Sequence, residues 1–152
     1  MSEIRPGLTL RPMTPADLAQ VLTIEQAGQP TPWSAGIFED CFRPGYRAEV
    51  VLSGDTVVAF QVLSSVLDEV HLLNIAVHPD WQRQGIARAL LEHTLRGLRD
   101  EDMSVFYLEV RAGNLAAQAL YLQLGFSITG ERRDYYRNAG GREDAVLMLR
   151  HL

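Results

Sequence analysis

The feature that most constrains this chain is a strand, a turn and a helix that follow one another in its middle. The run from Val70 to Val77 is apolar and β-rich, and His78-Pro79-Asp80 ends it. From Gly85 to Leu98 the apolar residues recur at helical spacing. The N-terminus of such a helix carries unpaired N–H groups and the positive end of the helix dipole, so it favours an anion. The pattern predicts an anion-binding turn in front of this helix.

Three residues of this turn favour phosphate as the anion. Gly85 has no side chain, which lets a ligand approach the backbone. Arg83 and Arg88 can each form paired hydrogen bonds with phosphate oxygens. The turn lacks the Gly-Lys-Ser/Thr of a nucleotide-hydrolysing loop and the G-x-G-x-x-G of a dinucleotide-binding fold. Glycines also mark turns that bind nothing, so the turn alone leaves a purely structural role open.

The other periodic segments predict an α+β fold, and a length of 152 residues predicts one domain over residues 1–152. A second strand–turn–helix junction joins Val105–Val110 to a helix that Asn114 caps and Gly125 ends. The other expected strands are Leu8–Arg11, Ala48–Leu52, Thr56–Ser64, Phe126–Gly130 and Ala145–Leu149, and the other expected helices run from Thr14-Pro15 to about Ala27 and from Ser34 to about Phe42.

Charge and cysteine usage argue against several classes of function. The net charge of −5 argues against a nucleic-acid partner, because phosphate binding needs a basic face, and it favours a basic partner. Cys41 is the only cysteine and the four histidines show no paired spacing, so neither an internal disulfide nor a metal site is expected. No apolar run approaches the ~20 residues that span a bilayer, so no membrane partner and a cytoplasmic location are expected.

Several blocks, in order and at fitting separations, resemble the GNAT superfamily of N-acetyltransferases. Its pyrophosphate-binding motif, Gln/Arg-x-x-Gly-x-Gly/Ala, is matched at Gln82, Gly85 and Ala87. Within the superfamily the chain is similar to the bacterial ribosomal-protein-alanine N-acetyltransferases, most closely over residues 66–148. The other blocks that carry the resemblance are Asn74-Ile75-Ala76-Val77, Leu108-Glu109-Val110-Arg111, Asn114, Ala119-Leu120-Tyr121, Leu124-Gly125-Phe126 and Gly141-Arg142-Glu143-Asp144-Ala145.

The resemblance implies an enzyme with the GNAT fold, whose mixed central sheet is splayed by a bulge and carries helices on both faces. Acetyl-CoA is then the acetyl donor and lies in the opening between the strand of residues 74–77 and the strand of residues 105–110. Main-chain N–H groups near Ile75, Ala76 and Val77 are expected to hold the thioester carbonyl, because attack by an amine places negative charge on its oxygen. The remaining residues expected to contact the donor are Arg83, Gln84, Gly85, Ile86, Ala87, Arg88 and Asn114.

The reaction needs a base and an acid, because the attacking amine must be neutral and the thiolate must leave as a thiol. Glu109 lies in an apolar strand, where burial is expected to raise its pKa, and it matches the family's catalytic glutamate. Tyr121 stands about two helical turns after Asn114, and the family places its general acid at this tyrosine. From the residues alone, Glu109 can instead pair with Arg111 at a strand end, and Tyr121 can be a core aromatic.

The acceptor is expected to be the α-amine of a protein N-terminus, alanine or serine, on a basic protein such as a ribosomal protein. An α-amine has an ordinary pKa near 8, against about 10.4 for lysine, so it loses its proton more readily at neutral pH. Trp33, Tyr135 and Tyr136 resemble the walls of the peptide groove in protein N-terminal acetyltransferases. A surplus of carboxylates would suit a basic peptide, at Asp68, Glu69, Asp134, Glu143 and Asp144.

Two alternatives stay open at this point, and the expected state is a monomer or weak oligomer. A GNAT enzyme that acetylates lysine side chains or a small amine would have a different groove, in which the tyrosine pair contacts nothing. A CoA-binding regulatory module without catalysis would not need to keep both Glu109 and Tyr121.

Overall fold

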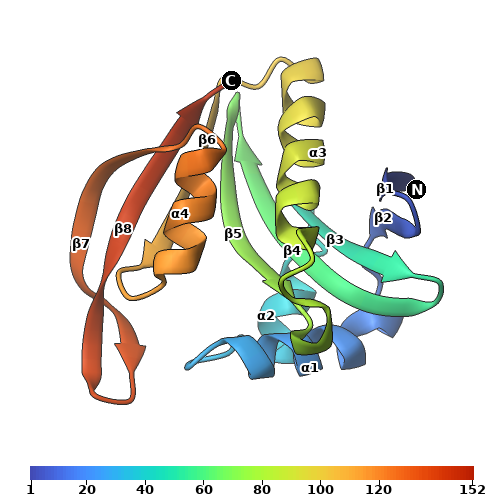
Figure 1. Cartoon of the computed structure of the whole chain (residues 1–152), viewed down its shortest axis with the longest axis horizontal. Coiled ribbons are helices and arrows are strands. Elements are labelled where there is room, and N and C mark those ends of the chain that lie inside the picture. Colours follow the sequence, from blue (N-terminus) through green and yellow to red (C-terminus); the bar gives the residue numbers. More distant parts are fainter.

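Eight strands form one sheet, and four α-helices lie against its two faces (Figure 1). The computed structural model describes residues 1–152. The strands are ordered β1-β2-β3-β4-β5-β6-β8-β7, and β5 and β6 form the one parallel pair. The predicted α+β class, with a mixed sheet and helices on both faces, is confirmed.

The elements have the following bounds. The strands are β1 (Ser2–Arg5), β2 (Leu8–Pro12), β3 (Tyr46–Ser53), β4 (Thr56–Val66), β5 (Glu69–Val77), β6 (Val105–Arg111), β7 (Ser127–Asn138) and β8 (Gly141–His151). The α-helices are α1 (Leu18–Gly28), α2 (Ala35–Asp40), α3 (Ile86–Asp100) and α4 (Leu115–Gln123), with short 3-10 helices η1 (Pro15–Asp17) and η2 (Pro79–Trp81). No helix combines the length and the apolar character that crossing a membrane requires.

The strands differ from the expectation at the two ends of the chain. The strand β1 is additional, and it pairs with β2 although Ile4 is its one buried apolar residue. β7 and β8 run on to a turn between Asn138 and Gly141, well beyond the expected segments. Most side chains of β7 are exposed, so its sequence lacks the apolar alternation that marks a strand with one buried face.

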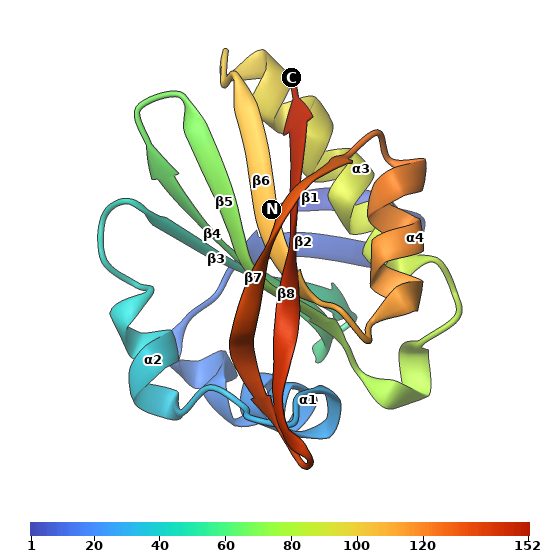
Figure 2. The ribbon, with the colours of Figure 1, turned by 90° about the vertical axis from the view of Figure 1, so that its left-hand side faces the viewer.

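Apolar side chains fill the space on both faces of the sheet. On one face Val21 and Ile24 of α1 and Phe38 of α2 pack against Phe60 of β4. On the other face three leucines of α3 and Tyr121 of α4 pack against β5, β6 and β8. Figure 2 shows these two helix pairs on either side of the strands. The strands are thereby held between two layers, and the middle of the sheet is fixed in position.

β5 and β6 separate part-way along their length. Their pairing covers Glu69–Leu72 and Val105–Leu108 and then stops. The register of β5 on β4 shifts at the same place, because Leu72 and Asn74 face consecutive residues of β4 and Leu73 is left as a bulge. The edge of β5 that faces β6 therefore has no strand partner from Leu73 to Val77. The predicted splay of the sheet is confirmed.

Side-chain caps begin α2 and α4 at the expected residues. The Ser34 hydroxyl accepts a hydrogen bond from Ile37 N at 3.4 Å. Asn114 Oδ1 accepts one from Ala117 N at 3.2 Å. These bonds satisfy N–H groups that have no partner inside the helix, which fixes where each helix starts.

An ion pair holds the segment in front of α1. Both Arg11 Nη atoms donate to the carboxylate of Asp17, at 2.7 and 2.9 Å, and Thr14 N donates to the same carboxylate at 2.7 Å. The hydrogen bond with Arg11 is the main cause that lowers the pKa of Asp17 below its ordinary value. Asp17 is buried, so this charge depends on its partners.

Candidate active site

A cleft of about 730 Å³ occupies the opening between β5 and β6. Most residues expected at the acetyl donor line it: Ile75, Ala76, Val77, Arg83, Gly85, Ile86, Ala87, Arg88 and Asn114. Gln84 does not line the cleft, and its main-chain carbonyl instead accepts a hydrogen bond from Arg5 Nη1 at 2.5 Å. The fold thus gathers segments from β5, the α3 turn and α4 around one space.

The turn before α3 has a backbone shape that glycine permits. Gly85 caps α3 with a φ of +75°, and Arg83 has a φ of +63°. Residues with a side chain adopt this left-handed region at a cost, whereas glycine does so freely. Gln82 Nε2 donates to the carbonyl of Val77 at 3.1 Å, which ties the turn to the end of β5. The first turn of α3 is therefore held with its N-terminus at the cleft.

Glu109 lines the cleft, and its carboxylate bonds to His71 rather than to Arg111. The distance from His71 Nε2 to Glu109 Oε2 is 2.5 Å, and the Glu109 side chain is 13% exposed. This hydrogen bond is the main cause that holds the pKa of Glu109 below its ordinary value, although burial acts in the opposite direction. The expectation of a raised pKa is wrong, because the apolar sequence of β6 says nothing of an imidazole on the neighbouring strand.

Tyr121 is both a core residue and a cleft residue. Its ring packs edge-to-face against Phe126 at 5.6 Å, and the residue is 6% exposed. Burial raises its pKa well above the ordinary value, so the hydroxyl keeps its proton at neutral pH. Tyr121 also lines the cleft, on the α4 side. The core reading of this tyrosine is confirmed, and its position at the cleft leaves the general-acid role as a prediction.

The α1–α2 loop forms a further part of the cleft lining. Trp33 lines it and packs edge-to-face on Phe38 at 5.2 Å. The buried carboxylate of Glu25 accepts hydrogen bonds from Trp33 N at 2.9 Å and from Asn74 Nδ2 at 3.1 Å. Glu25 thus ties the loop to β5 just after the bulge, which positions Trp33.

The two tyrosines of β7 have different surroundings. Tyr136 lines the cleft, and burial together with the charge of Glu109 raises its pKa to about 12. Tyr135 does not line the cleft, is 46% exposed and lies beneath the guanidinium of Arg132, at 5.2 Å from it. Of the expected pair, the structure brings Tyr136 alone to the site.

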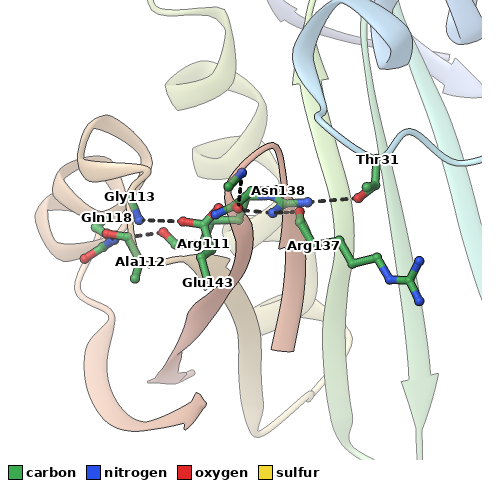
Figure 3. Close-up of polar contacts among 9 residues, drawn as sticks. Thr31, Arg111, Ala112, Gly113, Gln118, Arg137, Asn138 and Glu143 are labelled. Carbon is green, nitrogen blue, oxygen red and sulfur yellow. Dashed lines mark hydrogen bonds and ion pairs between the residues drawn. The ribbon is translucent and has the colours of Figure 1, made fainter. Parts of the chain in front are cut away.

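Arg111 connects the α1–α2 loop, which carries Thr31, with the β7–β8 hairpin (Figure 3). Its Nη2 donates to Thr31 Oγ1 of the α1–α2 loop at 3.0 Å. Its Nη1 donates to the carbonyl of Arg137 at 2.7 Å and to Glu143 Oε1 at 3.1 Å, both in the β7–β8 hairpin. The guanidinium also lies 4.4 Å from the ring centroid of Tyr136. We call this part of the cleft, between the loop and the hairpin, the loop–hairpin side.

Comparisons with known proteins agree with this geometry. The model of the Acetyltransferase (GNAT) family matches residues 16–126. The chain belongs to the GNAT acetyltransferase family. It is 42% identical, over 140 residues, to the [ribosomal protein bS18]-alanine N-acetyltransferase of Escherichia coli strain K12, covering 92% of this chain and 95% of that protein. It is 36% identical, over 137 residues, to the Haemophilus ducreyi protein of the same name, covering 90% and 94%.

A solved structure shows the same likeness in three dimensions. The crystal structure of the ribosomal-protein-S18-alanine N-acetyltransferase from Escherichia coli matches with a TM-score of 0.90 at 41% identity, covering 95% of this chain and 93% of that chain. This GNAT protein is an acetyltransferase, and acetyl-CoA is its acetyl donor. The predicted family, fold and donor are confirmed.

The acidic surface expected of this GNAT chain is not gathered at the cleft. None of the five carboxylates named for it lines the cleft. Asp68 accepts a hydrogen bond from Ser104, Glu143 pairs with Arg111, and Asp144 accepts one from Asp134 N. Glu25 and Glu109 are the carboxylates that do line it. The expected acidic residues are therefore not found among those that line the cleft.

Sequence reasoning missed four residues that hold the site together: His71, Arg111 in its bridging role, Thr31 and Glu25. His71 gave no signal, since a single histidine in a strand is commonplace. Arg111 stood inside a block that carried the family resemblance, but its expected partner was Glu109 and not the loop or the hairpin. Nothing in the sequence pointed to a contact of Thr31 or Glu25. Their partners lie far away in the sequence, so the contacts needed the folded chain.

Proposed function

We propose that this GNAT enzyme transfers the acetyl group of acetyl-CoA to the α-amine of an N-terminal alanine on a ribosomal protein. The observation that carries the proposal is the 42% identity, over 92% of this chain, to a [ribosomal protein bS18]-alanine N-acetyltransferase. Such an acceptor places the reaction in the cytoplasm.

The turn and the splayed strand suit the two ends of the acetyl donor. Gly85 and the N-terminus of α3 bind the pyrophosphate through main-chain N–H groups and the helix dipole. Arg83 and Arg88 line the same end and add positive charge. Along Leu73–Val77 the unpaired edge of β5 offers main-chain N–H groups to the thioester oxygen, which becomes negative when the amine attacks.

Glu109 and Tyr121 handle the protons of the transfer. Glu109 takes a proton from the α-ammonium, and the neutral nitrogen attacks the thioester carbon, so that a C–N bond forms. The C–S bond then breaks, and Tyr121 supplies the proton with which the thiol of CoA leaves. The nitrogen loses its second proton as the amide forms, and this proton restores the Tyr121 hydroxyl through water. The raised pKa of Tyr121 keeps this proton in place until the sulfur becomes negative. Both side chains line the cleft, Glu109 from β6 and Tyr121 from α4.

The loop–hairpin side of the cleft receives the acceptor, and it favours a peptide N-terminus over a lysine side chain. Trp33 and Tyr136 line it, and Arg111 holds the loop and the hairpin together at this place. An α-amine needs less help to lose its proton, because its ordinary pKa is about 2.4 units lower than that of lysine, or roughly 3 kcal/mol. Glu109 has a lowered pKa and is a weak base, so this difference matters more here.

The test is acetylation of matched peptides, followed by mass spectrometry that locates the acetyl group. One peptide begins with alanine, a second with serine, and a third with valine in the same sequence. The fourth contains lysine and has a blocked N-terminus. We expect the acetyl group on the α-amine, with alanine and serine preferred over valine, and no reaction of the blocked peptide. An acetyl group on the lysine ε-amine would show that the enzyme acts on side chains instead.

A further inference from the structure

His71 is fixed beside Glu109 from two directions. In the parallel pair of β5 and β6, His71 faces Tyr107, and Glu109 follows two residues later on the same side of β6. The imidazole stacks on the ring of Tyr107, with centroids 4.4 Å apart and an interplanar angle of 18°. Its Nε2 lies 2.5 Å from Glu109 Oε2. The stacking fixes the plane of the imidazole, and the hydrogen bond fixes the position of the Glu109 carboxylate.

Glu109 lines the cleft, whereas His71 does not. Any effect of His71 on the reaction must therefore pass through the carboxylate. A carboxylate has two oxygens, and Oε2 is engaged by His71, so Oε1 remains for a proton from the cleft. We propose that His71 is a positioning residue for Glu109: it holds the carboxylate toward the acceptor amine, and its charge controls how readily that carboxylate accepts a proton. The inference rests on the base role proposed for Glu109.

The charge of the imidazole changes the carboxylate without breaking the hydrogen bond. A neutral imidazole with its proton on Nε2 donates to Oε2, and so does the protonated ring. The protonated ring adds a positive charge at this short distance, which weakens Glu109 as a base and repels an approaching ammonium. Imidazole is the side chain that ordinarily changes its charge between about pH 5 and 8. Glu109 is therefore the stronger base when the neighbouring imidazole is neutral.

The other charged or titratable groups near this pair do not provide such a switch. From β6, the pKa of Tyr107 is raised by burial, and from β7 that of Tyr136 is raised to about 12. Arg132 of β7 acts on Glu109, and Glu69 of β5 acts on Tyr107, in each case through their charges. Carboxylates and arginines ordinarily keep their charge between about pH 5 and 8. An effect of pH on Glu109 in this range therefore points to His71.

The experiment compares two substitutions at His71 across pH. His71→Phe keeps a flat ring over Tyr107 but has no donor, whereas His71→Gln keeps an N–H donor but cannot become charged. We expect His71→Phe to lower kcat roughly 10–100-fold at pH 7.5, with KM for acetyl-CoA unchanged, and His71→Gln to recover most of that loss. The ratio of kcat/KM between wild type and His71→Gln should rise from about pH 5.5 to 8. The peptide's own titration cancels in this ratio.

Controls separate this inference from the proposed function. His151→Gln changes an exposed histidine at the end of β8, away from the cleft, and should behave as wild type at every pH. A Glu109→Gln enzyme that keeps the wild-type rate would refute the base role itself. If Glu109→Gln is inactive but the ratio for His71→Gln stays flat with pH, this inference alone is wrong. Should His71→Phe fail to fold in a thermal melt, the His71→Gln ratio still decides.

Discussion

Replacing Gly85 by valine tests whether the turn before α3 binds the pyrophosphate of acetyl-CoA. Gly85 has a φ of +75°, in the region that disfavours side chains, and it lines the cleft. A Cβ built there would meet no atom closer than Arg5 Nη1, at 3.6 Å. The free enzyme therefore has room for the side chain, and the added atoms affect the backbone conformation and the ligand rather than a packed neighbour.

Two separate magnitudes follow from this geometry. Holding a side-chain-bearing residue in the left-handed region costs about 1–2 kcal/mol, which lowers the melting temperature of a domain of this size by roughly 2–8 °C. The valine methyl groups also keep the pyrophosphate from the main-chain N–H groups. We expect acetyl-CoA to bind at least tenfold more weakly, equivalent to about 1.4 kcal/mol, as measured by isothermal titration calorimetry.

Gly54→Val is the matched control, because it separates backbone strain from lost binding. Gly54 lies between β3 and β4 with a φ of +60°, has no atom within 4 Å of a built Cβ, and does not line the cleft. Both variants should lose similar thermal stability, and Gly85→Val alone should lose affinity. A folded Gly85→Val enzyme that binds acetyl-CoA as tightly as Gly54→Val would refute the assignment of the turn.

The remaining predictions concern the proton handlers and the ion pair before α1. Glu109→Gln should lower kcat by about 10²–10⁴ while calorimetry finds the acetyl-CoA affinity unchanged, and Tyr121→Phe should lower turnover, measured as release of free thiol. Asp17→Asn should lower stability by about 1–3 kcal/mol at neutral pH, since it leaves Arg11 without its charged partner. The folded pKa of Asp17 is lowered, so its contribution is present above about pH 4 and is lost as the pH falls through the folded value. Melting curves of wild type and Asp17→Asn should therefore converge in acid, and a difference that persists there would contradict this account.

The parts of the fold with an apolar period could be predicted from the sequence. The leucines of α3 recur at helical spacing, and the apolar runs of β4 and β5 are long, so burial itself leaves a trace in the sequence. The outer half of β7 leaves no such trace, because its side chains are mostly exposed and its strand is held by main-chain bonds to β8. The register of an exposed strand depends on its partner strand and on the connecting turn, and the pattern of apolar residues specifies neither of them.

Site residues were predictable where a short segment makes its own structure. Gly85 shapes a turn and Asn114 caps a helix through contacts within three residues, so the sequence motif already contains the geometry. His71 and Glu109 lie 38 positions apart, and Arg111 and Thr31 lie 80 apart. Their meeting depends on the strand order and on the register of parallel strands, which periodicity does not specify. The pKa of Glu109 was mispredicted for the same reason.

The position of Glu109 in the sheet explains why its carboxylate can both bond to His71 and face the cleft. The pairing of β5 with β6 ends at Leu72 and Leu108, and Glu109 is the next residue of β6. Where β5 and β6 are still paired, the strands are close enough for His71 to reach Glu109 Oε2. On the open side, β5 has moved away after the bulge at Leu73, and the cleft begins. Two residues earlier, Tyr107 is stacked under the imidazole, and two residues later, Arg111 is occupied by the loop and the hairpin. A carboxylate at position 107 or 111 would lack either the bond to His71 or the access to the cleft. The end of the paired segment therefore makes position 109 the suitable one for the base.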